Sequence, residues 1–435
     1  MTSTIQRGLY WFRNDLRLDD NSALHAMTQN VESAAFVFII DERWFAPSVH
    51  GFDRMGPHRM QFMVQSVLAL EQALLEQGHE LVILTGDPAT CILEAANMLG
   101  CSQVFGQKEH TQEETEAENR IESVISAHWI EGQTLLHPED LPMSLNDLPE
   151  VFSRFRNKVE KGGLKIRPLV HVEQWPIPIQ VNALLFTGWL QRCESVLCPP
   201  VVPGAMVFEG GALAGRKRLD AYLWDTRLLS RYKETRNGLL GYDYSSKFSP
   251  WLAWGCLSAR QIHAEVSRYE HEIEANESTY WLIFELLWRD YFRFIAMQHG
   301  NRIWSEFGIK GKAAHLHMKP HESSWQNWIN GTTDDDFVNA NMRELRATGF
   351  MSNRGRQNVA SYAIHDLGLD WRPCAAWFER ELIDYDPCSN TGNWLYVAGL
   401  GNDPRPNRKF DLQWQTQRYD PDGHYRAFWN TSSRP

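Results

Sequence analysis

The chain has 435 residues, of which 43% are hydrophobic, and its formal net charge is −11. This length exceeds a single ordinary hydrophobic core, so two or three globular domains are expected. The N-terminus lacks the apolar core of a signal peptide and no run of about 18 apolar residues occurs, which indicates a cytoplasmic protein, or an organellar one in a eukaryote, without a membrane partner. The negative charge excludes diffuse binding to nucleic acid, so any DNA contact must come from a local basic patch.

Cysteine and tryptophan are the two informative residue types. The seven cysteines form no CxxC pair and no set spaced with histidines, so we expect no metal and no disulfide framework, and interpret them as reduced, mostly buried thiols. Of the 18 tryptophans, 13 lie beyond residue 220. Most of these indoles are expected to pack in a large aromatic core.

Short apolar runs alternate with helical patterns from residue 8 to residue 137. Strands are predicted over 8–15, 34–41, 80–86, 102–107 and 133–137, and helices over 57–77, 88–99 and 111–127. Such alternation is typical of an α/β domain with a doubly wound parallel sheet. The first strand is followed by RNDLRLDDN instead of GxGxxG, so a dinucleotide is not expected to bind through that motif. Ligands of such sheets lie beyond the carboxyl ends of the strands, which points to the segments after Phe12, Ile40 and Phe105.

The rest of the chain divides into two parts. Residues 138–215 contain nine of the 20 prolines and few periodic stretches, which indicates a long connector on the surface. Beyond residue 216 the pattern is helical throughout. We therefore expect an α/β domain over 1–137, the connector over 138–215 and a mostly α-helical domain over 216–435.

Two segments of the helical part combine apolar and charged residues. In FELLWRDYFRFI (284–295) the apolar residues recur at helical spacing, and the pattern alone favours a buried helix with an ion pair between Glu285 and Arg289. In 342–358, arginines at 343, 346, 354 and 356 accompany a single acid. This predicts either an anion site, where Gly349 and Gly355 allow a ligand to approach the backbone, or a solvated basic face.

Two further polar segments each admit two interpretations. Residues 382–394 (LIDYDPCSNTGNW) are typical turn formers and helix caps, but they can also present carboxylate and amide groups to the polar edge of a ring. Residues 242–258 combine clustered hydroxyls with a helix start at Ser249. Free N–H groups at such a start suit phosphate, although an N-cap alone explains them.

Together these segments resemble the photolyase and cryptochrome family, most closely its cryptochrome DASH branch. The resemblance rests on WFRNDLRLDDN at 11–21, on RYKETRNGLLGYDYSSKFSPWLAWGCLS and ELLWRDYFRF, and on a stretch from 339 to 410 that holds NANMRELRATGFMSNRGRQNVASY, LIDYDPCSNTGNWLYVAG and GNDPRPNRKF. It implies an N-terminal α/β domain, a connector and a helical domain that binds FAD in a folded shape, which agrees with the periodicity.

The resemblance also implies which residues contact FAD. Arg356 and Asp384 match the pair that flanks the isoalloxazine ring, Asp386 lies beside it, and Asn390 matches the residue that faces flavin N5. Hydrogen bonds and charge near the ring decide which flavin redox state is stable. The other positions implied to contact FAD are Tyr232, Ser245, Ser246, Lys247, Phe248, Ser249, Arg289 and Asn353.

The implied substrate is a cyclobutane pyrimidine dimer that is flipped out of its strand into a cavity above the flavin. Photoexcited reduced FAD is implied to give an electron to the dimer, which splits and returns it. Glu285 would bind the edge of the damaged base while Trp288 packs against it. The positions implied to contact DNA are Arg236, Glu285, Trp288, Asn353, Arg354, Gln357 and Tyr396.

Two of these positions bear on the form of the DNA. Gln357 stands where the duplex-acting photolyases carry methionine, and Tyr396 where they carry tryptophan. A less apolar pocket recovers less of the unstacking cost, which is smaller for a single strand than for a duplex. We therefore predict a preference for lesions in single-stranded DNA, where stacking and local basic contacts suffice.

The resemblance extends to electron and energy transfer. Trp371 and Trp394 match two members of the tryptophan chain that carries electrons to photoexcited oxidised flavin, although core packing explains either one singly. The third member would fall near Met318 or Lys319, so Trp325 is named as its substitute. Glu109 matches the acid that holds the pterin ring of an antenna, 5,10-methenyltetrahydrofolate; a solvated acid at a helix start is the alternative.

These expectations describe a monomeric deoxyribodipyrimidine photolyase that acts on single-stranded DNA. The main alternative is a blue-light receptor whose output is a partner interaction; because the chain ends soon after HYRAFW, we expect no output through a C-terminal tail. A photolyase acting on duplex DNA is a second alternative. A dark flavin reductase is opposed by the lack of a nicotinamide-binding motif.

Overall fold

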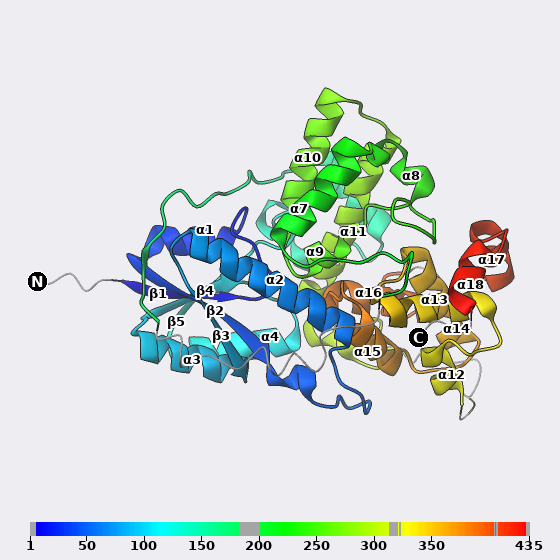
Figure 1. The fold of residues 1–435 in the computed structure, drawn as a ribbon, viewed down its shortest axis with the longest axis horizontal. Coiled ribbons are helices and arrows are strands. Elements are labelled where there is room, and N and C mark those ends of the chain that lie inside the picture. Colours follow the sequence, from blue (N-terminus) through cyan, green and yellow to red (C-terminus); the bar gives the residue numbers. More distant parts are fainter. Residues whose placement is uncertain are drawn as a thin grey trace, which may run out of the picture.

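The computed structural model describes residues 6–181, 201–312, 321, 323–403, 405 and 408–431. An α/β part, formed by the start of the chain, lies beside a helical part formed by its second half (Figure 1). Helices α2 (Pro57–Glu76) and α15 (Trp371–Glu381) are among the elements that meet between the two parts.

The α/β part is built on a parallel sheet, as predicted. Its main strands are β1 (Arg7–Phe12), β2 (Ser33–Asp41), β3 (Leu81–Gly86), β4 (Gln103–Gln107) and β5 (Ser126–Ile130). They lie in the order β3-β2-β1-β4-β5, and every neighbouring pair is parallel. The order reverses direction at β1, so a crevice for a ligand is expected beyond the carboxyl ends of β1 and β4.

Helices cover both faces of this sheet (Figure 1). Helices α1 (Ser22–Asn30) and α2 lie on one face, and α3 (Pro88–Leu99) and α4 (Gln112–Glu122) lie on the other. The sequence patterns predicted α2, α3 and α4 but not α1, which begins where the side chain of Asn21 accepts a hydrogen bond from Leu24 N at 3.1 Å. Burial on both faces explains why every residue of β2 is buried.

The strand predicted over 133–137 is wrong, and β5 lies further upstream, where the helix predicted over 111–127 was expected to end. The backbone N–H groups of Leu135 and Leu136 donate to the carboxylate of Asp290, at 3.0 and 2.8 Å. Asp290 belongs to α11 (Glu277–His299). A side chain from the helical part therefore supplies the acceptors that a neighbouring strand would have supplied, a contact that local pattern does not contain.

The predicted connector is partly ordered into elements. It contains α5 (Phe152–Lys161) and a two-residue strand, β6 (Ile177–Pro178), that pairs with Ser33 and Ala34 of β2. The apolar run that begins at Ile177 continues beyond residue 181, outside the described residues.

Beyond residue 216 the described chain contains helices and no strand, as the pattern predicted. The helices not yet named are α7 (Ala212–Asp220), α8 (Tyr232–Thr235), α9 (Ser249–Ala253), α10 (Ala259–Glu272), α12 (Ser324–Asn330), α13 (Asp336–Thr348), α14 (Asn353–His365), α16 (Pro387–Val397), α17 (Leu412–Tyr419) and α18 (His424–Asn430).

The RNDLRLDDN segment after β1 joins the two parts of the molecule. Asp20 is fully buried and forms an ion pair with Arg260 of α10, at 2.7 Å. Arg17 donates to the carbonyl oxygen of Gly255, at 2.8 Å. The motif at the expected dinucleotide position therefore holds the helical part against the sheet.

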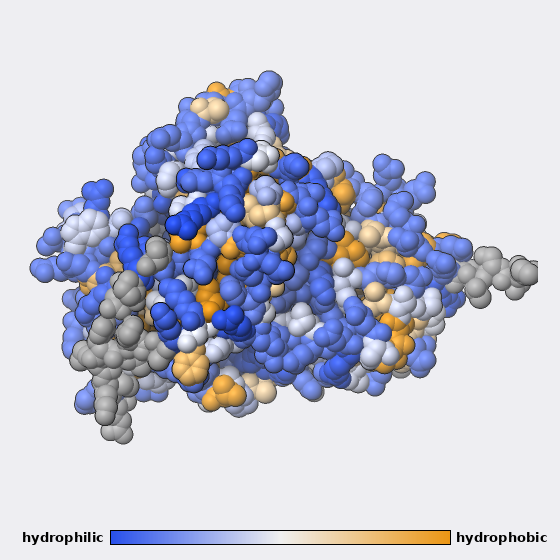
Figure 2. Space-filling view, turned by 180° about the vertical axis from the view of Figure 1, so that it is seen from behind, coloured by the Kyte–Doolittle hydropathy of each residue, from blue (hydrophilic) through white to orange (hydrophobic). Residues whose placement is uncertain are grey.

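Within the described residues, the surface, the helix lengths and the cysteines indicate no further site. Figure 2 shows a face that is mostly hydrophilic, with hydrophobic residues in small separate patches. Among the described helices, none is long and apolar enough to cross a membrane. The five cysteines that the structure describes are free thiols, and four of them are buried.

Candidate functional site

A cavity of about 440 Å³ opens in the helical part, with walls contributed by α8, α9, α11, α14 and α16. It brings together every residue that the sequence placed at the flavin or the DNA, apart from Glu109 and Trp371. Those in its wall are Tyr232, Arg236, Ser245, Ser246, Lys247, Phe248, Ser249, Glu285, Trp288, Arg289, Asn353, Arg354, Arg356, Gln357, Asp384, Asp386, Asn390, Trp394 and Tyr396.

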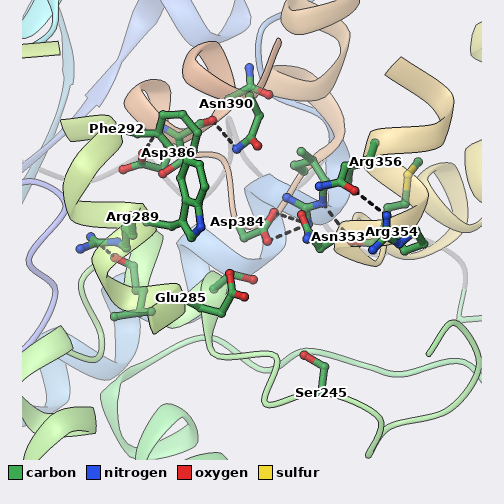
Figure 3. A pocket seen from close by; sticks show the side chains of 18 of the residues that line it. Ser245, Glu285, Arg289, Phe292, Asn353, Arg354, Arg356, Asp384, Asp386 and Asn390 are labelled. Carbon is green, nitrogen blue, oxygen red and sulfur yellow. Dashed lines mark hydrogen bonds and ion pairs between the residues drawn. The ribbon is translucent and has the colours of Figure 1, made fainter. Parts of the chain in front are cut away.

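An ion pair in the cavity wall joins Arg356 of α14 to Asp384 in the turn that precedes α16 (Figure 3). The Arg356 guanidinium donates to both carboxylate oxygens of Asp384, at 2.9 and 2.7 Å, and to the carbonyl oxygen of Met351 at 2.9 Å. The Asp384 side chain is 1% exposed. This arrangement holds a cation and its partner rigidly in the cavity wall.

Asp386 has two roles at the start of α16. It accepts a hydrogen bond from Ser389 N at 2.6 Å, which caps the helix as the sequence suggested, and it forms an ion pair with Arg293. Burial raises the pKa of Asp386, but the charges of Arg293 and Arg289 and the hydrogen bonds from Ser389 outweigh burial, so the pKa lies below its usual value. Asp386 therefore stays ionised.

Asn390 lies one turn into α16 and faces the cavity (Figure 3). Its amide nitrogen donates to the carbonyl oxygen of Ala375 at 3.1 Å. No other group among the described residues bonds to this side chain. The amide oxygen is thus left as an acceptor for an N–H group of a ligand.

The loop before α9 forms the opposite wall. Arg218 of α7 donates to the carbonyl oxygens of Tyr242, Ser245 and Ser246, at 3.0–3.1 Å, and so fixes the loop. Lys247 adopts a left-handed backbone conformation, with φ 55°. Burial lowers the pKa of Lys247 to about 8. The Lys247 ammonium group donates to the carbonyl oxygen of Gly241 at 3.0 Å. Ser245, Ser246 and Ser249 line the cavity on either side of Lys247 in the chain, and their hydroxyl groups suit a phosphate.

Glu285 and Arg289 do not form the predicted ion pair. Glu285 pairs instead with Arg236, which follows α8, and burial raises the pKa of Glu285 while Arg236 opposes that rise. Arg289 donates to the carbonyl oxygens of Gln133 and Leu252, at 2.5 and 3.3 Å. Glu285 and Arg289 therefore bond to segments that pack against α11, and not to each other.

Trp288 and Tyr396 form the remaining aromatic wall. Trp288 stacks on Phe152 of α5, with ring centroids 3.8 Å apart, so one of its faces is already covered. The rings of Tyr396 and Trp288 meet edge to face, with centroids 6.1 Å apart. Arg408 donates to the Tyr396 hydroxyl at 2.6 Å and lies 4.5 Å from its ring, so this part of the pocket is polar.

The arginines of 342–358 do not form one joint anion site. Arg354 and Arg356 line the cavity, whereas Arg343 and Arg346 bond to Asn430 and Asn330 elsewhere. The predicted use of the glycines is also wrong. A Cβ at Gly355 would overlap Asn341, and Gly349, with φ 67°, ends α13, so both glycines admit other protein groups and not a ligand.

An array of aromatic rings leads away from the cavity. Trp394 lies 6.2 Å from Trp328, and Trp328 lies 5.9 Å from Trp325, measured between ring centroids. The array therefore includes the predicted Trp394 and Trp325, joined by Trp328, which was not predicted. None of the ring contacts between described residues involves Trp371, which is buried. Met318 and Lys319 lie outside the described residues.

Glu109 follows β4 and lies outside the cavity wall. It is 2% exposed, lies 3.7 Å from Arg293, and accepts a hydrogen bond from Gln133. Burial raises the pKa of Glu109 to about 7, although Arg13 and Arg293 oppose the rise. Arg293 thus links Glu109 to Asp386 at the main cavity.

A second cavity, of about 340 Å³, lies where the reversal of strand order predicts a ligand. Arg13 and Asn14 after β1, Asp41 at the end of β2, and Thr111 before α4 line it. Tyr385 lines both cavities. The turn that carries Asp384 and Asp386 therefore contributes to the walls of both cavities.

Sequence reasoning missed some residues of the site. Arg293 and Arg408 pair with predicted residues, and Phe292 and Asn237 line the cavity. One signal was available. Arg289 and Arg293 stand four residues apart in a helix rich in apolar residues, a spacing that places two cations on one face and calls for polar partners from elsewhere.

Comparison with known proteins identifies the family. A family model described as the FAD binding domain of DNA photolyase matches residues 281–432, and one described as DNA photolyase matches residues 8–176. Cryptochrome DASH of Synechocystis sp. is 44% identical and covers 97% of this chain and 86% of its own length. The Arabidopsis thaliana protein named "Cryptochrome DASH, chloroplastic/mitochondrial" is 41% identical, over 97% of this chain and 75% of its own.

Solved structures agree with the sequence relatives. The crystal structure of Synechocystis cryptochrome matches with a TM-score of 0.90 and 43% identity, over 99% of this chain and 89% of that one. A photolyase from Sulfolobus tokodaii, solved with two FAD molecules, shares the fold with a TM-score of 0.78 at 22% identity, over 98% of this chain and 90% of that one. This chain is a flavoprotein of the photolyase and cryptochrome family and belongs to its cryptochrome DASH group.

Proposed function

We propose that this protein is a light-driven photolyase that repairs cyclobutane pyrimidine dimers in single-stranded DNA. The observation that carries the proposal is that one cavity holds both residue sets, those expected at the flavin and those expected at the lesion. When bound and photoexcited in its reduced form, FAD supplies the electron that opens the dimer.

The cavity wall suits a flavin. The amide oxygen of Asn390 is an open acceptor, Arg356 is a fixed cation, and the loop from Ser245 to Ser249 lines the cavity. We propose that Arg356, Asp384, Asp386 and Asn390 surround the ring system, and that the loop from Ser245 to Ser249 holds the phosphates. The charges of this wall would then set the redox state of the flavin.

The lesion is proposed to lie against Glu285 and Trp288. Burial raises the pKa of Glu285 while its ion pair with Arg236 opposes that rise, and the carboxylate oxygens of Glu285 can accept hydrogen bonds from a pyrimidine edge. Trp288, backed by Phe152, offers one rigid face for packing. No acid, base or metal ion is needed for the bond cleavage itself.

The proposed preference for single strands rests on two polar positions of the pocket. Gln357 accepts a hydrogen bond from Arg354 at 2.9 Å, and Tyr396 accepts one from Arg408. Both side chains are thus engaged with cations and offer little apolar area to a flipped dimer. Burial of the dimer in this pocket therefore recovers less of the free energy that unstacking it from a duplex costs, and binding to a strand that is already unpaired is favoured.

The test is repair of a thymine dimer under blue light, in single-stranded and duplex oligonucleotides side by side, with a dark control. We expect light-dependent repair that is much faster on the single strand. The double variant Gln357→Met with Tyr396→Trp should narrow the difference, because it restores apolar area. Equal repair of both forms by the unmodified protein would refute the preference.

A blue-light receptor is the second candidate, favoured by the aromatic array of Trp394, Trp328 and Trp325. Such a path can deliver electrons from the surface to photoexcited oxidised flavin. Flavin photoreduction that persists in a protein unable to repair either DNA form would favour this function over repair.

An antenna is proposed at Glu109. We propose that Glu109 contacts the pterin ring of methenyltetrahydrofolate, because a protonatable carboxyl group at the carboxyl edge of the sheet suits the amino-pyrimidine edge of that ring. A Glu109→Ala protein should then lose the near-ultraviolet pterin absorbance. Retention of that absorbance would refute the assignment.

A further inference from the structure

An unusual tryptophan lies just outside the main cavity. Among the tryptophans that the structure describes, Trp414 is the one classed as exposed, with 52% of its surface accessible. An indole in water forfeits a large apolar contribution to folding, so its exposure calls for a reason. A single exposed aromatic residue is not evidence of a binding site, so the residues around Trp414 must show whether it belongs to one.

Trp414 stands on a rigid support. It lies in the first turn of α17, where Asp411 caps the helix by accepting a hydrogen bond from Trp414 N at 3.0 Å. Two neighbours on the same helix, Leu412 and Gln415, face the protein, with Leu412 packed against the main core and Gln415 buried. A ligand that contacts the indole therefore loses little conformational freedom of the protein.

A line of side chains connects Trp414 to the cavity. The rings of Trp414 and Tyr419 meet edge to face, with ring centroids 6.4 Å apart and planes at 85°. The guanidinium of Arg354 lies 4.7 Å from the centre of the Tyr419 ring. Arg354 itself lines the cavity and bonds to Gln357 and Asn237. The indole is thus two contacts away from the place proposed for the lesion.

Positive charge accompanies this line. Arg418 is exposed, lies four residues after Trp414 on the same helix, and makes no ion pair with any described residue. Arg354 and Arg408 also line the cavity, where Arg408 forms an ion pair with Asp403 at 2.6 Å. In contrast, Trp281 at the Arg236 side of the cavity is partly buried and has Lys233 and Arg236 over its ring, at 4.9 and 5.2 Å.

We propose that Trp414 is a stacking platform for one base of a single DNA strand whose damaged dinucleotide occupies the cavity, and that Arg418 contacts a phosphate of the same strand. An exposed aromatic side chain beside an exposed arginine is the combination that holds single strands without regard to sequence. Paired bases of a duplex cannot lay a face on the indole, so the platform adds to the preference for single strands. This inference rests on the proposed function and adds a contact outside the lesion pocket.

The test is the affinity of two dimer-containing oligonucleotides, measured by fluorescence anisotropy with FAD-loaded protein in the dark. One strand ends next to the dimer, and the other extends several nucleotides to both sides. Trp414→Ala should weaken binding of the long strand by roughly 5- to 150-fold, the range for loss of one base–aromatic stack, and leave the short strand within about 2-fold. Trp414→Phe should retain most of the affinity.

Two further variants separate stacking from other effects. Leu75→Ala, which removes an exposed apolar side chain from α2 in the α/β part, is the matched control and should change neither affinity. Arg418→Gln should lower the slope of log affinity against log salt for the long strand by about 0.7, the loss of one phosphate contact.

The outcomes distinguish the two proposals. An unchanged affinity of the Trp414→Ala protein for the long strand, or an equal loss for both strands, overturns the platform while leaving photorepair in place. Failure of the unmodified protein to bind either strand contradicts the proposed function itself, and the platform with it.

Discussion

Replacing Arg356 with alanine should destabilise the protein by leaving Asp384 without its cation. The Asp384 side chain is 1% exposed and accepts two hydrogen bonds from Arg356, at 2.9 and 2.7 Å. Removing one partner of a buried ion pair costs ~3–5 kcal/mol because the other charge stays buried. Since the Arg356 side chain is 25% exposed, water can replace part of the interaction, and we expect the lower end, ~3 kcal/mol.

A double-mutant cycle isolates this effect from any lost flavin contact. The free energy of unfolding is measured by urea denaturation for Arg356→Ala, Asp384→Asn and the double variant. The double variant should be more stable than the sum of the single losses predicts, by ~2 kcal/mol, because the buried charge is gone. Arg372→Ala is the control: its pair with Asp370 is about 40% exposed on both sides and should cost less than ~1 kcal/mol. A coupling energy below ~0.5 kcal/mol would show that Asp384 does not depend on Arg356.

Three other expectations follow from buried groups. Gly392→Ala should lower the flavin-to-protein absorbance ratio, since a Cβ there would overlap Phe292 in the cavity wall, an overpacking that costs ~1–3 kcal/mol; an unchanged ratio contradicts this. Asp290→Ala should lower the free energy of unfolding by ~2–5 kcal/mol, because the buried N–H groups of Leu135 and Leu136 lose their hydrogen-bond acceptor. A loss under ~1 kcal/mol would mean that water replaces the carboxylate. For Glu109, a pKa raised from 4.5 to about 7 in the folded protein means that the native state binds the extra proton between those values, so stability falls by ~3 kcal/mol as pH rises through them. Glu109→Gln should flatten that part of the curve in urea titrations from pH 4.5 to pH 7.5, and an unaltered slope would assign the pH dependence to other groups.

Local pattern was enough for much of the fold. Apolar alternation located β1 to β4 and helices α2 to α4 in the sheet, because burial on both faces imposes those periods on the chain. It failed at 133–137, where two leucines are buried but their backbone bonds to Asp290, more than 150 residues later in the chain. It also missed α1, which at nine residues is shorter than α2, α3 and α4 and so offers fewer periodic positions.

Predicting the residues of the candidate site required more than the periodicity of the sequence. Periodicity alone favoured an ion pair between Glu285 and Arg289, which was wrong, and charge alone left open whether the four arginines of 342–358 form an anion site or a solvated face. In the structure two of these arginines line the cavity and two bond elsewhere. Resemblance to the family selected the residues that line the cavity, because it carries information on which distant segments meet. It did not supply Arg293 or Arg408, the cations that partner two of those residues.

The sequence by itself therefore determined the α/β and helical parts, the family and most of the residues around the main cavity, since these follow from local periodicity and from motifs that occupy contiguous stretches of chain. Only the tertiary structure decided the partners of the buried charges, the insertion of Trp328 between Trp394 and Trp325, and the position of Trp414 at the end of a line from the cavity. The physical reason is that a buried charge or an aromatic ring interacts with whatever packing brings within a few ångströms, and that neighbour is set by the fold and not by separation along the chain.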